Sequence, residues 1–175
     1  MTKNSRLTSN VFRLAILALA IAGSGSAMAA DAVANSSSTV IAAIDIAKTT
    51  DLAFGSFAAT AAAGTVTVTP GSARSVTGVT AVGSTATAAQ FDVTGQSGMG
   101  YSISVVATPL TSGTDSMSFT PISDLTASAN TSGTVAVGTL TGGAQSIFVG
   151  GVLSVAANQA AGTYNGTVTA SVDYN

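Results

Sequence analysis

The stretch AGTYNGTVTASVDYN, residues 161–175, decides the fold class of this chain. Apolar and polar residues alternate along it with a period of two, which is the period of a β-strand with one buried face. The first face carries Tyr164, Gly166, Val168, Ala170, Val172 and Tyr174. The other face carries threonine, serine, asparagine and aspartate. The pattern therefore predicts one uninterrupted strand that buries its first face, with no later strand in the sequence to pair with its free edge.

Strand signals of the same kind recur along the rest of the sequence, separated by Gly, Ser and Thr turns. They predict strands over residues 38–47, 51–57, 64–70, 74–82, 86–95, 101–107, 116–123, 133–140 and 146–157. The pair Gly150 and Gly151, inside the last of these ranges, indicates a bulge or bend. No segment after residue 29 has a convincing helical period. We therefore predict an all-β fold, an antiparallel β-sandwich.

The first residues have the layout of a secretory signal peptide. Three cations, Lys3, Arg6 and Arg13, precede or border the apolar run LAILALAIAG (14–23), and the small residues AMA (27–29) follow. The apolar run is shorter than the about 20 residues that span a bilayer as a helix. We predict a signal peptide over residues 1–29 and cleavage before Ala30, which leaves 146 of the 175 residues for a single domain. The protein is therefore expected to be exported, to the periplasm or the cell surface.

The composition of the remaining chain excludes several classes of function. Lys48 and Arg74 stand against seven aspartates, a net charge of −5, which leaves no basic patch for nucleic acid or for insertion at an anionic membrane. Cysteine, histidine, tryptophan and glutamate are absent, so disulfides, the usual nucleophile–base pairs and zinc sites cannot be built. We predict no enzymatic activity, no cofactor and no metal. The β-branched and weakly charged composition also favours a packed domain over a disordered chain.

The N-terminal stretch ADAVANSSSTVIAAIDIA, residues 30–47, carries a second apolar stripe at even positions. Its members are Ala32, Ala34, Val40, Ala42, Ile44 and Ile46. One interpretation is a complete sandwich that begins with this stretch and ends with residues 161–175. In a second, residues 30–40 are an extension ahead of a domain over 41–175, with Ala32, Ala34 and Val40 as a strand-donor stripe. In a third, residues 39–47 are the donor and the first strand begins near Leu52.

Several motifs carry a resemblance to known families. As in chaperone–usher pilins, Tyr174 is penultimate, Gly162 is the fourteenth residue from the end, and Val168, Ala170 and Val172 alternate between them. The segments LAFGSF, GTVTVTP, AAQFDVTGQSGMGYSISV and VGGVLSVAANQAAGTYNGTVTASVDYN resemble an uncharacterised family of small exported bacterial proteins. That family is in turn similar to spore coat protein U and to the archaic pilins. The chain differs from many pilins because it lacks the disulfide cysteines near the first strand.

The resemblance implies an immunoglobulin-like sandwich that lacks its last strand and is completed by a donated one. The groove for the chaperone or donor strand would then be formed by Gly162, Tyr164, Val168, Ala170, Val172 and Tyr174. The implied partners are a periplasmic chaperone, an outer-membrane usher, and neighbouring identical or related subunits. The implied function is a structural subunit of a bacterial surface fibre or coat that polymerises by donor-strand exchange. The alternative is a self-contained secreted β-sandwich that binds a carbohydrate or another surface ligand.

Overall fold

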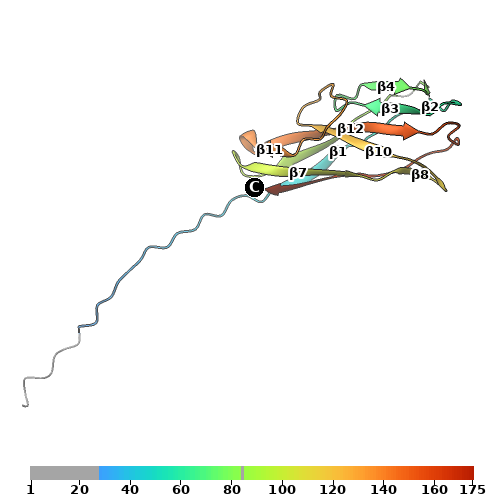
Figure 1. Cartoon of the computed structure of the whole chain (residues 1–175). Helices are drawn as coiled ribbons and strands as arrows, with labels where there is room; N and C mark the ends of the chain where they lie inside the picture. The colour runs from blue at the N-terminus through green and yellow to red at the C-terminus, as the bar shows by residue number, and fades with distance from the viewer. Residues whose placement is uncertain (1–27, 84) are drawn as a thin grey trace, which may run out of the picture. The chain divides into compact units, whose positions relative to one another are not determined.

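The computed structural model describes residues 28–83 and 85–175, and their regular structure is antiparallel β-sheet (Figure 1). The predicted all-β, antiparallel fold class is confirmed. The predicted signal peptide lies outside the described residues except for Met28 and Ala29. The chain divides into two units after Thr39. In the first unit the described residues, 28–39, are exposed and form no helix or strand, and every strand named below belongs to the second unit.

The larger sheet is organised around one long central strand, β12 (Ala144–Val155). The strand order is β1 (Asp45–Thr50), β6 (Ala89–Thr94), β12, β3 (Gly64–Val68) and β4 (Arg74–Thr77), with β10 (Phe119–Asp124) also paired to β12. β12 pairs first with β6, as far as Val149, and then with β3, from Gly151 onward. β10 pairs across both halves, over Phe148 to Leu153. It therefore lies on the opposite edge of β12 from β6 and β3.

A second sheet has the order β11 (Val137–Thr139), β7 (Gly100–Ala107) and β13 (Val168–Tyr174). Two small pairs complete the fold: β2 (Phe57–Ala58) with β5 (Thr80–Ala81), and β8 (Leu110–Ser112) with β9 (Asp115–Met117). A short 3-10 turn, η1 (Thr141–Gly143), precedes β12.

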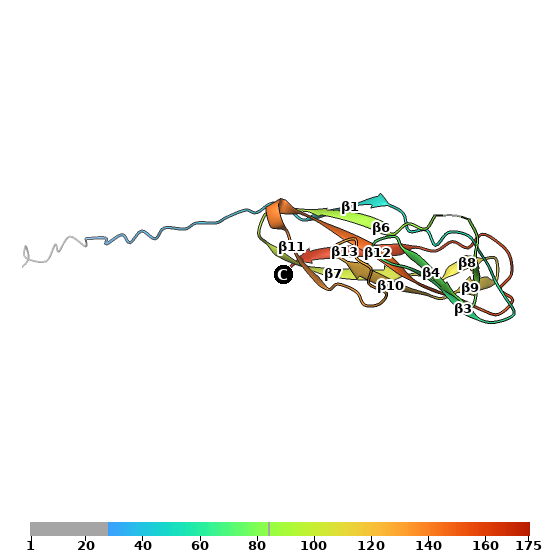
Figure 2. The same ribbon diagram turned by 90° about the horizontal axis from the view of Figure 1, so that it is seen from above.

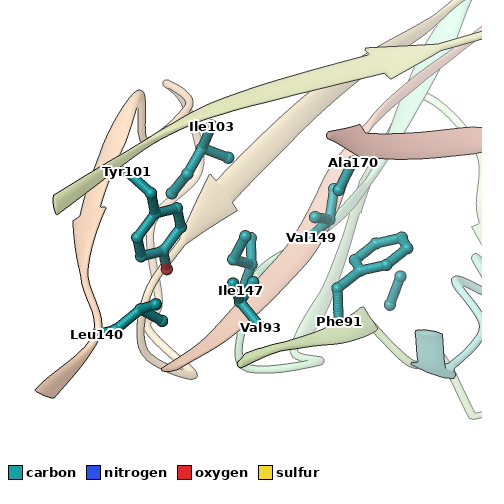
Figure 3. Close-up of a cluster of buried hydrophobic side chains, with 9 residues drawn as sticks. Phe91, Val93, Tyr101, Ile103, Leu140, Ile147, Val149 and Ala170 are labelled. Atoms are coloured by element: carbon teal, nitrogen blue, oxygen red, sulfur yellow. The ribbon is translucent and has the colours of Figure 1, made fainter. Parts of the chain in front are cut away.

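The main core cluster lies between these two sheets. Figure 3 shows Phe91, Val93, Ile147 and Val149 from the larger sheet, Tyr101, Ile103 and Ala170 from the smaller sheet, and Leu140 from the segment before η1. The alternation predicted for β6 and β7 is what places these side chains inward, because every second residue of a strand faces the same side. The cluster therefore fills the space between the two layers of a β-sandwich.

A second core cluster lies under the other half of β12. Its buried members are Phe54, Val66, Val68, Val79, Met117, Leu153 and Val155. Phe54 contacts Phe119 edge to face, with ring centroids 5.4 Å apart and planes at 85°. This cluster forms the base on which the candidate site is built.

Of the bulge or bend predicted at Gly150 and Gly151, the bulge is absent from the ladder with β10. β12 pairs with β10 through both glycines without any shift of register. A Cβ at Gly150 would lie 2.0 Å from the carbonyl oxygen of Val68, and a Cβ at Gly151 would lie 2.1 Å from the ring of Phe119. The pair is there because β3 and Phe119 approach the β12 backbone too closely for any side chain.

Several predicted strands are shorter than the sequence pattern indicates. The strand predicted over 38–47 begins only at Asp45, the strand predicted over 51–57 is reduced to β2 and an isolated bridge at Ala53, and β11 covers only part of 133–140. The uninterrupted strand predicted over 161–175 begins only at Val168. There its partner β7 ends at Ala107, and Pro109 follows, which has no N–H to donate; past it the two segments are joined again only by an isolated bridge between Thr111 and Asn165.

Candidate strand-binding groove

A cavity of about 1100 Å³ opens between two segments that lie mostly outside the two sheets. One wall is formed by residues 48–59, after the main part of β1, and the other by residues 159–168, which lead into β13. The floor is formed by Ala89, Phe91, Leu110, Met117, Phe119 and Leu153. Both views of the ribbon place these two segments toward the end of the sandwich away from the C-terminus (Figures 1 and 2). We call this cavity the groove.

The first wall follows β1 and leaves the larger sheet. After Thr50 it is tied back by the bridge between Ala53 and Thr87, whose two backbone hydrogen bonds are each 2.9 Å long. Gly55 then adopts a φ of 73°, in the left-handed region that glycine enters without strain. This turn interrupts the extended conformation before β2, so the wall is held at separate points instead of along a continuous ladder.

The second wall begins beyond the turn that ends β12. Directly beside the two walls, Asn158 N donates to Thr60 O at 2.8 Å and so joins the two segments at one end. The hydroxyl of Tyr164 donates to Ala160 O at 2.8 Å and accepts from Gln159 Nε2 at 2.9 Å. These bonds, together with the packing of the Tyr164 ring against the second core cluster, hold this wall in place.

Two strand edges border this side of the sandwich without pairing to each other. In the described ladders β13 pairs with β7, and β1 pairs with β6, so each has one edge that no strand covers. Unpaired N–H and C=O groups along a sheet edge are a template for another extended chain. The groove is an apolar hollow next to such edges.

The charge within the groove is low. Lys48 and Asp51 form an exposed ion pair at the rim, and pairs of this kind contribute little to stability in water. The other lining residues are uncharged. Among the described residues, no three His, Cys, Asp or Glu side chains come together as metal ligands. The groove therefore suits an uncharged, partly apolar segment.

The six residues predicted to form the groove divide into two sets of three. Gly162, Tyr164 and Val168 line it. Ala170, Val172 and Tyr174 lie farther along β13 and pack against the main core cluster instead. Within β13 the predicted alternation is present, because these residues and Val168 are buried or half-buried while the residues between them are exposed. The cavity thus extends along the segment before β13 more than along β13 itself.

Tyr174 has a role that the alternation alone could not indicate. Its hydroxyl accepts a hydrogen bond from Gln96 N at 2.6 Å and donates one to Ala42 O at 3.0 Å. The end of β13 therefore fixes the point at which the N-terminal chain joins the sandwich. Of the predicted donor stripe, Ala32 and Ala34 are exposed, and Val40 is 94% exposed.

The wall over residues 48–59 was not predicted from the sequence. Leu52 and Phe54 look like one face of a short strand, and that pattern gave no indication that the segment borders a cavity. The one local signal is Gly55 in the middle of an apolar run, which is typical of a bend or of a close approach.

A family model described as "Domain of unknown function (DUF4402)" matches residues 44–174. Neither the curated proteins nor the solved structures give a match. Because the comparisons name neither pilins nor spore coat protein U, that resemblance stays a prediction. Within the part of the chain that the structure describes, there is no helix long and apolar enough to cross a membrane.

Proposed function

Because the chain belongs to a family described as a domain of unknown function (DUF4402), we propose a function from the geometry of its groove: the protein is an exported structural subunit whose groove accepts an extended segment of a second subunit. The observation that carries the proposal is the groove itself, an apolar-floored hollow between the two walls beside the unpaired edges of β1 and β13. The product would be a fibre or coat at the bacterial surface.

The donor in this proposal is the N-terminal arm, residues 30–41. An extended chain rises about 3.3 Å per residue, so the arm is about 40 Å long and the second wall, 159–168, about 33 Å. The predicted donor residues Ala32, Ala34 and Val40 are exposed and form no strand. An exposed segment with alternating small apolar residues is suited to adding a strand to a sheet edge.

A second copy is a better source of this arm than the same chain. The arm is fixed to the sandwich at Ala42 by Tyr174, and Tyr174 is six residues beyond Val168 on β13. An arm that starts at Ala42 and runs back along β13 would need about six residues, or about 20 Å, before it reached the near end of the groove. An arm from another subunit has no such constraint and can lie along the full length. A donor and an acceptor at different places on one subunit give a head-to-tail contact that does not close on itself.

Backbone pairing contributes much of the expected affinity, because the donor side chains are small. A ten-residue segment along one edge could form about five hydrogen bonds, each worth about 0.5–1.5 kcal/mol net. Burial of Val40 would add about 1.5 kcal/mol. Larger apolar side chains would fill the same cavity better, so a periplasmic chaperone that offers such a strand could occupy the groove during export and an usher could then guide the exchange.

Binding of a carbohydrate or another small ligand is the second candidate. It is favoured by the aromatic side chains Phe54, Phe57, Phe119 and Tyr164 in the lining, and the volume is slightly above the usual range of about 300–1,000 Å³ for small-molecule sites. In this case the sandwich would be monomeric and its arm would have no role in the groove.

A matched pair of arm variants tests the strand-accepting function. In the chain from Ala30 to Asn175, we expect Ala34→Asp to prevent assembly, because it places a charge on the donor face that must enter an apolar groove. Val33→Asp adds the same charge on the opposite face and should assemble like the unaltered chain. Both positions are exposed, so both variants should keep the unfolding temperature of the sandwich.

Assembly is measured by analytical ultracentrifugation and by electron microscopy of the purified proteins. A strictly monomeric unaltered chain at high concentration would contradict the proposal and favour the ligand-binding alternative. Loss of assembly with Val33→Asp but not with Ala34→Asp would show that the opposite face of the arm is buried.

A further inference from the structure

The first groove wall is contacted by one arginine from β4, the last strand in the order of the larger sheet. Arg74 begins β4, where it pairs opposite Val68 of β3. Its Nη1 atom donates to the carbonyl oxygens of Phe54, at 3.3 Å, and of Ser56, at 3.2 Å. These carbonyls flank Gly55, the residue at which the wall turns with a φ of 73°.

The wall is also attached on both sides of this turn, and after it β2 pairs with β5 through Phe57 and Ala58. The neighbouring attachments are the bridge between Ala53 and Thr87 and the bond from Val82 N to Ser56 O at 3.0 Å. A backbone carbonyl that is withdrawn from water needs a donor. A guanidinium has several N–H groups in a planar arrangement, and the two hydrogens of one terminal nitrogen can serve two carbonyls at once.

The charge of Arg74 is not used in an ion pair within the described residues, where the one salt bridge joins Lys48 and Asp51. Arg74 is half-buried, and its guanidinium donates to neutral acceptors. After the predicted signal peptide it is the sole arginine in the sequence. The residue is therefore placed as a brace for the backbone on both sides of Gly55.

The brace fixes the position of two side chains that line the groove. Phe54 precedes Gly55 and is held in the second core cluster against Phe119, and Phe57 follows Ser56 and lines the cavity. If the turn at Gly55 relaxed, these rings would be free to move into the hollow and fill the space that a donated strand needs.

We propose that Arg74 is a positioning residue that keeps the 48–59 wall of the groove in its strand-accepting conformation. This inference rests on the proposed function for its consequence in binding, but the bracing of the wall can be measured separately. It predicts that replacing Arg74 loosens residues 53–58 selectively and weakens strand binding more than it weakens the fold.

The test uses the full chain from Ala30 and three variants. Arg74→Met removes the donors and keeps an unbranched side chain, and Arg74→Lys keeps a charge that can serve one carbonyl well. Gln145→Leu is the matched control, because Gln145 Nε2 also donates to a loop carbonyl, that of Leu125 at 3.3 Å, away from the groove. The probe is a fluorescently labelled peptide of residues 30–43, and its affinity is measured by anisotropy alongside amide hydrogen exchange and thermal unfolding.

We expect Arg74→Met to accelerate exchange of the amides in residues 53–58 at least tenfold and to weaken peptide binding at least tenfold. Arg74→Lys should lie between Arg74→Met and the unaltered chain, and Gln145→Leu should bind the peptide normally. Unchanged exchange at 53–58 in Arg74→Met would overturn the inference, whether or not the peptide binds. Failure of the unaltered chain to bind the peptide would instead count against the proposed function. Faster exchange at 53–58 with unchanged peptide affinity would overturn the link between the brace and binding.

Discussion

Ala170→Asp is expected to unfold most of the protein or to lower its unfolding temperature by about 10 °C or more. Ala170 is 9% exposed and belongs to the core cluster between the two sheets. An unpaired carboxylate at such a site costs several kcal/mol, which is comparable to the whole stability of a domain of this size. Ser171→Asp, one residue on and on the exposed face, should change stability by less than about 0.5 kcal/mol.

The effect of Ala170→Asp should depend on pH. Burial disfavours the charged form, so the pKa of the introduced carboxyl would be raised in the folded state above its unfolded value of about 3.9. The folded state then binds more protons than the unfolded one, and stability falls as pH rises through this range. Thermal unfolding measures this. The unfolding temperature of Ala170→Asp should lie less far below that of the unaltered chain at pH 4 than at pH 7. Equal unfolding temperatures for Ala170→Asp and Ser171→Asp at pH 7 would contradict the assignment of faces on β13.

Gly150→Ala is expected to destabilise the fold by about 3 kcal/mol, at the upper end of the usual cost of overpacking. The added Cβ would lie 2.0 Å from the Val68 carbonyl oxygen, so β3 and β12 would have to separate where β12 changes partner. Gly83→Ala is the control, because no heavy atom lies within 4 Å of that Cβ position. Denaturant unfolding measures both. If Gly150→Ala left the stability unchanged, β3 and β12 would have to lie farther apart at this point than they do in the structure.

The strands that could be predicted from the sequence are those whose pattern and partner agree. β3, β6 and β7 lie within the predicted ranges or differ from them by a residue, since alternating apolar side chains on such strands fill a core directly. Where the partner ends early, the pattern overestimates the strand. Residues 38–44 extend beyond the end of β6 at Thr94, and residues 161–167 extend beyond the place where Pro109 ends the β7 ladder.

The groove could be predicted only in part, for a related reason. The second wall was included through Gly162, Tyr164 and Val168, because they belong to the alternating C-terminal segment. The first wall depends on Arg74 and on the turn at Gly55, which are brought together by the pairing of β3 with β4 and not by nearness in sequence. A local pattern cannot indicate a contact of this kind. It also cannot indicate that the hydroxyl of Tyr174 fixes the start of the arm at Ala42.

The most direct test of the central claim is whether the arm of one subunit enters the groove of another. The chain contains no cysteine, so disulfides can form only between the introduced thiols. Ala34→Cys in the arm is mixed with a separate chain carrying Ala161→Cys or Ala58→Cys in the groove walls, and disulfide formation is measured under mild oxidation. A disulfide needs Cα atoms about 4.4–6.8 Å apart, and two wall positions allow for differences in register.

The control for this measurement is Val106→Cys, which is 61% exposed on β7 and does not line the groove. We predict that Ala34→Cys forms crosslinked pairs with at least one groove variant far faster than with Val106→Cys, and that excess unlabelled peptide of residues 30–43 suppresses them. Crosslinking at the groove positions that is no faster than at Val106, or that the peptide does not affect, would contradict strand donation between subunits.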